Sequence, residues 1–101
     1  MKLYHRTFAA EKILQDGFKD ATRSYLTSNS YTGVWFSDKP LDVNEGANGD
    51  VVLTIEMPEK VFMEHEWVED GKGYREALIP ADVTNRYGPP IIFLYERCVP
   101  L

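Results

Sequence analysis

Residues 2–18 read KLYHRTFAAEKILQDGF, and this stretch decides the fold. Residues 2–6 predict a short first strand. A helix is predicted over residues 9–17, because apolar side chains recur there at i, i+3 and i+4 spacing and a glycine commonly ends a helix. The recurring residues are Ala9, Ala10, Ile13 and Leu14, and the closing glycine is Gly17. The chain therefore opens with a strand followed directly by a helix.

After this helix the sequence predicts mainly strands. Residues 20–32 are polar and are interpreted as a loop, and a loop of this length in a compact domain is usually functional or mobile. Residues 51–57 alternate in character, which predicts a strand with one buried and one exposed face. Further strands are predicted at 33–37, 61–63, 75–80 and 91–98, a short helix at 40–45, an acidic turn-like segment at 64–73 and one helical turn at 81–86.

These elements indicate a single α+β domain spanning residues 1–101. The sequence predicts about six strands and one convincing helix, and the strands cluster after the helix instead of alternating with it. A parallel α/β fold is therefore not expected.

Two common kinds of binding site are not found in the sequence. A Gly-x-Gly-x-x-Gly turn is absent, so a dinucleotide would have to bind through an architecture other than a Rossmann domain. The acidic neighbours of His65 do not indicate a metal site, because no second histidine or cysteine lies near. We interpret that segment as a solvated face.

The charge and cysteine content restrict the partners and the compartment. The formal net charge is −5, and affinity for nucleic acid comes largely from Lys and Arg, so a nucleic-acid partner is not expected. The single cysteine, Cys98, suits a reducing cytoplasm and is interpreted as a buried strand residue in preference to a catalytic thiol. Neither a signal peptide nor an apolar run of the ~20 residues needed to cross a membrane is found, so we expect a cytoplasmic protein.

Three side chains are candidates for chemistry, each with an alternative structural role. His5 lies in the first predicted strand, where a histidine is more often a hydrogen-bonded core or edge residue than a functional group. Glu76 begins an apolar strand, so its carboxylate either ends the strand in water or projects into a cleft. Trp35 alternates with Val34 and Phe36; if those two face the core, its indole faces outward as a platform for a flat ring.

Three motifs, in order, resemble those of the ADP-ribosyltransferase fold. Residues 3–7 followed by 13–18 are similar to the family's opening, a strand with His-x-Ser/Thr and a helix ending in Ile-Leu-x-x-Gly-Leu/Phe. Residues 33–38 resemble the segment Gly-apolar-Tyr-Phe-small-acidic, with Trp35 in the tyrosine position. Residues 75–80 are similar to the glutamate-bearing strand of the DNA-modifying transferase toxins. The resemblance implies a miniature, toxin-like member with a split β-sandwich and one main helix after the first strand.

The resemblance also implies NAD as the substrate and a His–aromatic–Glu triad. In this triad His5 hydrogen-bonds the adenosine ribose and Trp35 packs on the nicotinamide. Glu76 bonds the nicotinamide-ribose hydroxyl and stabilises the oxocarbenium-like state, so His5 and Glu76 are the expected catalytic residues. Arg23 would bind the pyrophosphate as a charge-assisted donor, or else lie solvated in its loop. NAD is expected to contact His5, Arg6, Thr7, Arg23, Tyr31, Trp35, Ser37 and Tyr74.

The expected activity is transfer of ADP-ribose from NAD, with release of nicotinamide, to an acceptor that the sequence does not identify. A variant of this chemistry removes a 2′-phosphate from RNA, but an acidic chain supplies few of the basic residues it needs. A second interpretation is a catalytically degenerate member that binds a nucleotide or a protein. A third is a small domain whose motif matches are coincidental. The oligomeric state is likewise left open.

Overall fold

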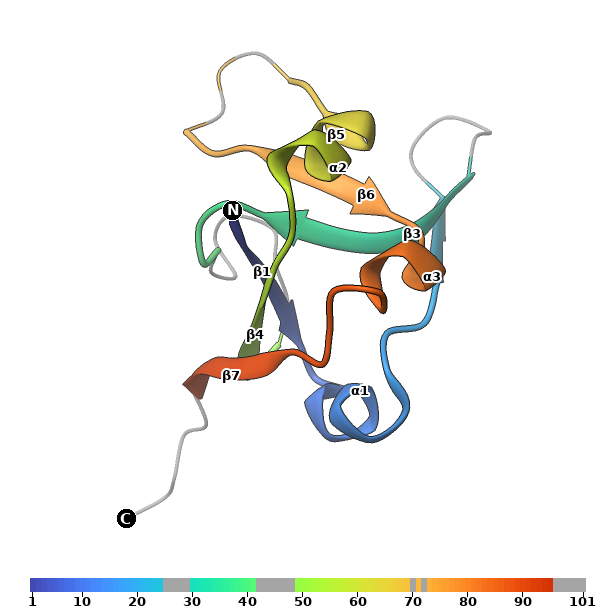
Figure 1. Ribbon diagram of the computed structural model, residues 1–101, viewed down its shortest axis with the longest axis vertical. Coiled ribbons are helices and arrows are strands. Elements are labelled where there is room, and N and C mark those ends of the chain that lie inside the picture. The colour runs from blue at the N-terminus through green and yellow to red at the C-terminus, as the bar shows by residue number, and fades with distance from the viewer. Residues whose placement is uncertain (25–29, 42–48, 70, 72, 96–101) are drawn as a thin grey trace.

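The computed structural model describes the chain apart from residues 25–29, 42–48, 70, 72 and 96–101, and it describes residues 22–24, 30, 31, 94 and 95 by their backbone (Figure 1). The described elements are β1 (Lys2–Thr7), α1 (Ala10–Asp16), β2 (Ala21–Ser24), β3 (Ser30–Ser37), β4 (Val51–Glu56), α2 (Glu59–Glu64), β5 (Glu66–Trp67), β6 (Glu76–Ile79), α3 (Ala81–Thr84) and β7 (Ile91–Tyr95). Helices and strands are mixed, and every strand pairing among the described residues is antiparallel, so the α+β class is confirmed.

The strands form one connected sheet with two distinct halves. Its order is β5-β6-β3-β1-β4-β7, and β2 pairs with the first part of β3. Within one half, β1 pairs with β4 along its whole length, from Lys2↔Glu56 to Thr7↔Val51. The two halves are joined where β1 meets β3, in the register Tyr4↔Ser37. The sheet consequently turns at this junction, and β3 runs across the direction of β1 and β4 (Figure 1).

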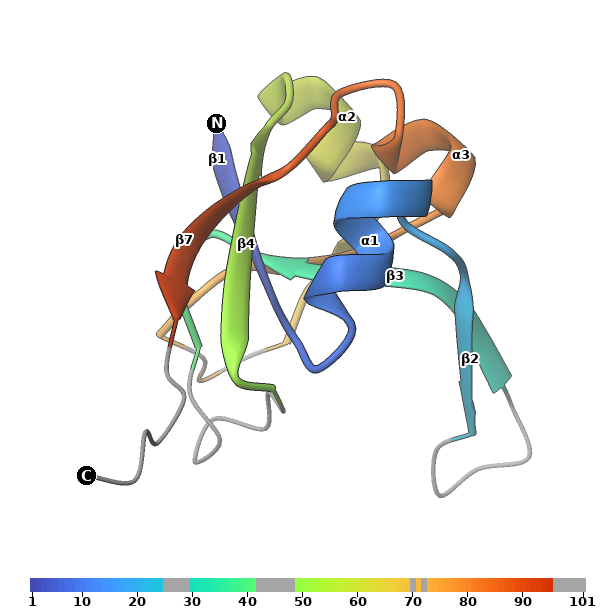
Figure 2. The same cartoon turned by 90° about the horizontal axis from the view of Figure 1, so that it is seen from below.

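The core lies between this bent sheet and the helices. Figure 2 shows α1 in front of β3, with α2 and α3 above it. Each of α1, α2 and α3 contributes a buried residue to one cluster with the inward side chains of β1, β3, β4 and β6. The cluster contains Leu3, Ala10, Phe18, Val34, Phe36, Val51, Leu53, Ile55, Met57, Phe62, Ala77, Ile79 and Ala81. The opposite face of the sheet is therefore free to carry other side chains.

The predicted opening of the chain is confirmed. Helix α1 spans Ala10–Asp16, and Gly17 follows it with a φ of 84°, a left-handed conformation that favours glycine. Its backbone N–H donates to the carbonyl of Ile13 at 2.8 Å, which closes the last turn of the helix. The predicted strands at 33–37 and 75–80 and the helical turn after Pro80 are present as well.

Two predicted elements were wrong. Residues 20–32 were expected to be a loop, but β2 (Ala21–Ser24) pairs with β3 from Ala21↔Gly33 to Ser24↔Ser30. The polar side chains of β2 give no local strand signal, and backbone pairing with β3 decides its conformation. Residues 61–63 were expected to be a strand but lie in α2, where Phe62 is fully buried and Met63 is 60% exposed. Burial of one apolar side chain per turn favours the helix over the local β-preference.

Strand β4 is buried on both faces, not on one as its alternation predicted. Tyr4 of β1 and Phe93 of β7 are in edge-to-face contact with ring centroids 4.9 Å apart. Because β4 lies between those two strands, the two rings meet across it on the face that carries Thr54, which is opposite Tyr4 and is buried.

Three further sequence predictions concern residues 64–73, the segments that contain residues 40–45 and Cys98, and membrane-spanning helices. The expected acidic turn at 64–73 contains the short strand β5. The predicted helix at 40–45 falls mostly, and Cys98 entirely, outside the described residues. Within the described part of the chain, none of the helices is long and apolar enough to cross a membrane.

Candidate functional site

Trp35 and Glu76 lie on the same face of two neighbouring strands. In the β3–β6 pair, Trp35 is opposite Leu78 and Ser37 is opposite Glu76. Directly opposed residues of an antiparallel pair project to the same face, and residues two apart along a strand do so too. The indole and the carboxylate are therefore diagonal neighbours on the face opposite the core residues Val34 and Phe36, which agrees with the outward position expected for Trp35.

A second indole joins them. Trp67 of β5 is opposite Glu76, and its ring makes an edge-to-face contact with that of Trp35 at a centroid distance of 5.8 Å. All three side chains are partly buried. We call the surface formed by Trp35, Ser37, Trp67, Glu76 and Leu78 the Trp35 face. Trp67 was missed by sequence reasoning because it lies in an acidic segment interpreted as a turn; a tryptophan among glutamates was the available signal.

His5 is joined to the same part of β3 but from the other side. Its Nδ1 lies 2.7 Å from the backbone carbonyl oxygen of Trp35. A carbonyl can only accept, so Nδ1 carries the proton of this bond. The imidazole packs edge-on against Phe18 and tilted against Phe36, each at a centroid distance of 5.6 Å. Since the Phe36 side chain faces the core, the structure places the His5 ring and the Trp35 ring on opposite sides of β3.

Arg6 and Thr7, expected to contact NAD, make bonds within the chain. The buried Arg6 guanidinium donates from Nε to the carbonyl of Leu41 at 2.6 Å and from a terminal nitrogen to that of Gly49 at 3.1 Å. The Thr7 hydroxyl accepts the backbone N–H of Ala9 at 2.9 Å, just before α1 begins. Both side chains hold the segments around the end of β1.

Glu76 is positioned by the residue before it. The backbone N–H of Arg75 donates to the Asp38 carboxylate at 2.9 Å, and the backbone N–H of Asp38 donates to the Arg75 carbonyl at 3.0 Å. The guanidinium binds both carboxylate oxygens of Glu66, at 3.0 and 2.8 Å, and one oxygen of Glu59 at 2.8 Å. These contacts fix the start of β6, where Glu76 leaves the turn.

The electrostatics of this cluster follow from its hydrogen bonds. Donation by Arg75 lowers the pKa of Glu66, and the two carboxylates together raise the pKa of Arg75. The guanidinium also lies 5.1 Å from the centroid of the Phe62 ring, a cation–π contact that joins the cluster to α2. Arg75 directly precedes β6, and neighbouring residues of an extended chain project to opposite faces. The Arg75 cluster therefore lies on the face of the sheet opposite the Glu76 carboxylate.

The other expected contacts are less closely grouped. Ser37 is on the Trp35 face but is buried, with its hydroxyl donating to the Lys39 carbonyl at 2.6 Å. Tyr74 is half-buried just before the Arg75 cluster. The side chains of Arg23 and Tyr31 lie outside the described part of the structure. Their backbones are paired with each other in the β2–β3 hairpin, at the end of β3 away from Glu76.

The chain matches no family model, no curated protein and no solved structure. The site is therefore characterised by its own geometry. Among the described residues, no group of three or more His, Cys, Asp and Glu side chains could hold a metal ion. The Trp35 face offers two aromatic rings, a carboxylate and an aliphatic side chain, a set suited to a flat ring that carries a hydroxyl donor.

Proposed function

We propose that this chain is an ADP-ribosyltransferase-like protein that binds NAD on the Trp35 face and transfers its ADP-ribose. One observation carries the proposal: the register of β3 and β6 makes the Trp35 indole and the Glu76 carboxylate diagonal neighbours on one exposed face. The order of the three sequence motifs adds support.

In the proposed reaction the Trp35 indole binds the substrate and the Glu76 carboxylate stabilises the transition state. The nicotinamide ring packs on Trp35, and the ribose attached to it donates a hydroxyl hydrogen bond to Glu76. The bond between C1′ and the nicotinamide nitrogen breaks, and its electron pair leaves with nicotinamide. The nucleophilic atom of the acceptor then bonds to C1′ and releases its proton to solvent. Positive charge develops at C1′ before the new bond forms, and the carboxylate stabilises that charge.

A catalytically degenerate nucleotide-binding module is the second candidate, and the His5 geometry favours it. His5 bonds the Trp35 carbonyl and packs among Phe18 and Phe36, while Arg6 and Thr7 bind the backbone. In this alternative the first motif has a structural role and the Trp35 face binds a nucleotide without turnover.

The test combines turnover with binding. Nicotinamide release from NAD is measured with water as acceptor, and NAD affinity is measured by calorimetry, for wild type, Glu76→Gln and Trp35→Ala. Glu56→Gln, an exposed glutamate at the end of β4, is the matched control for loss of one carboxylate. Glu76→Gln keeps the size of the side chain and removes its charge. We expect nicotinamide release to fall by about 10²–10³-fold while NAD affinity changes by less than about tenfold.

The outcomes separate the candidates. Trp35→Ala is expected to act mainly on NAD affinity, because it removes a stacking surface and no charge. NAD binding without release of nicotinamide in wild type would support the degenerate module. Absence of binding at millimolar NAD would refute the transferase and an NAD-binding module alike. Nicotinamide release that is unchanged in Glu76→Gln would refute Glu76 as the catalytic carboxylate.

A further inference from the structure

Strand β7 is an edge of the sheet with little of the usual protection. It ends the strand order, and its described pairing is with β4. An edge strand presents unpaired backbone N–H and C=O groups, and natural proteins commonly cover such an edge or place lysine or proline in it. The five residues of β7, Ile91–Tyr95, include no charged residue and no proline.

The exposed side chains of β7 are apolar on both of its faces. Ile91 is 67% exposed, Ile92 49% and Phe93 51%. Ile92 is opposite the core residue Leu53, whereas Phe93 reaches Tyr4 on the other face. A strand added beside β7 would therefore remove apolar surface from water above and below the sheet, which favours association.

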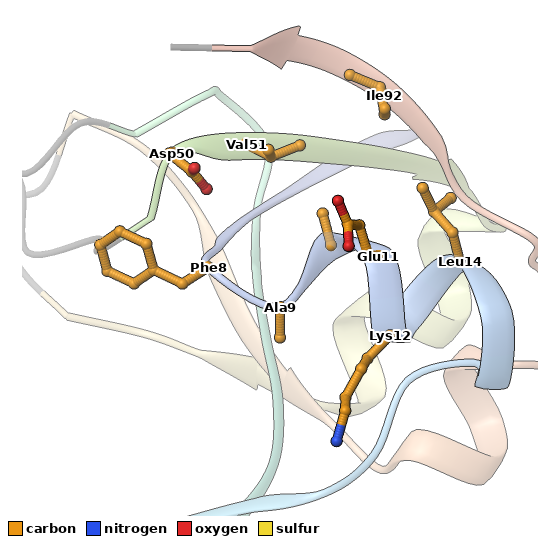
Figure 3. A pocket seen from close by; sticks show the side chains of 9 residues that line it. Phe8, Ala9, Glu11, Lys12, Leu14, Asp50, Val51 and Ile92 are labelled. Carbon is orange, nitrogen blue, oxygen red and sulfur yellow. The ribbon is translucent and has the colours of Figure 1, made fainter. Parts of the chain in front are cut away.

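A groove with apolar side chains from both elements adjoins β7 on the side of α1. The groove has a volume of about 410 Å³ and is lined in part by Ile92, Val51 and Leu14 (Figure 3). Phe8 forms one end of the groove and is 77% exposed. Glu11, Lys12 and Asp50 also line the groove, so the surface without charges is that of β7 itself.

We propose that the occupant of this edge is a second copy of the chain, paired with β7 in antiparallel orientation across a two-fold axis. Such an axis pairs the residues of the segment with residues of the same segment in the other copy, so a segment without charges brings no like charges together. The net charge of −5 makes most approaches of two copies repulsive, and β7 avoids this because it is uncharged. The opposite edge strand, β5, contains Glu66 and lacks this property.

The proposal is independent of NAD binding and is tested by the oligomeric state. Sedimentation equilibrium is run over roughly a hundredfold range of protein concentration for wild type, Ile91→Lys and Val68→Lys. Val68 is 80% exposed outside β7, so the two variants add the same charge to similar residues at different places. Wild type is expected to dimerise, Val68→Lys to match it, and Ile91→Lys to associate about a hundredfold more weakly, because each dimer carries the substitution twice at about tenfold each.

Two further readouts do not depend on Ile91→Lys remaining folded. Hydrogen exchange of the wild-type β7 amides should slow as the protein concentration rises. Dimerisation should also strengthen with salt, which screens the repulsion between two acidic copies. A wild type that stays monomeric overturns the proposal. So does a dimer that Ile91→Lys leaves intact, or one that both lysine variants weaken equally.

Discussion

Asn85, at the end of α3, holds the segment after α1 by two hydrogen bonds, and its removal should destabilise the fold measurably. The side-chain oxygen accepts the backbone N–H of Phe18 at 2.8 Å, and the side-chain nitrogen donates to the Phe18 carbonyl at 2.9 Å. The amide thus satisfies both backbone groups of Phe18, as a neighbouring strand would. Phe18 in turn packs against His5 and Phe36, so these bonds also fix one wall around the imidazole.

The expected cost of Asn85→Ala is about 2 kcal/mol of unfolding free energy, since each of two hydrogen bonds contributes about 1 kcal/mol net. For a domain of this size that corresponds to a fall in Tm of about 8–16 °C. Urea denaturation followed by circular dichroism gives the free energy directly. The control is Arg86→Ala on the same turn, whose 3.9 Å contact with Asp82 is exposed; it should cost less than about 0.5 kcal/mol.

Asn85→Asp provides a sharper version of the same test. The introduced carboxylate can still accept from the Phe18 N–H, but its second oxygen faces the Phe18 carbonyl and cannot donate. The variant should therefore keep one of the two bonds, lose the other and be less stable than wild type at neutral pH. A cost below about 0.5 kcal/mol for Asn85→Ala, or stability of Asn85→Asp equal to wild type at neutral pH, would refute the role assigned to the amide.

Three other perturbations have definite expected results. Because Arg75 lowers the pKa of Glu66 in the folded protein, Glu66→Gln should destabilise above the usual glutamate pKa of 4.5, and the difference in unfolding free energy from wild type should vanish as the pH falls through the folded-state pKa. Gly49→Ala should cost more than about 2 kcal/mol in urea denaturation, since φ is 149° and the new Cβ would lie 2.4 Å from backbone atoms of Thr7. Thr54→Val should stabilise by about 1 kcal/mol, because the buried Thr54 hydroxyl has no hydrogen-bond partner; a lower Tm would contradict this.

Sequence alone predicted those features of the site that depend on the alternation of side chains along a single strand. Placing Trp35 opposite its neighbours Val34 and Phe36 required only the period of two. Whether His5 shares the Trp35 face could not be read in this way, because that depends on how β1 meets β3. The register Tyr4↔Ser37 puts His5 beside the core-facing Phe36.

By itself the sequence determined those helices and strands for which the local sequence pattern predicts the same conformation that burial in the core favours. The strand–helix opening closed by Gly17 and the strand at 75–80 are of this kind, because periodicity and turn residues act over a few neighbouring positions. Only the tertiary structure decided the conformation of β2, whose polar residues become a strand by pairing with β3. It also decided the helical state of Phe62 and the burial of Thr54, because both depend on distant parts of the chain. Phe62 is buried in the common core cluster, and the rings of Tyr4 and Phe93 meet across β4.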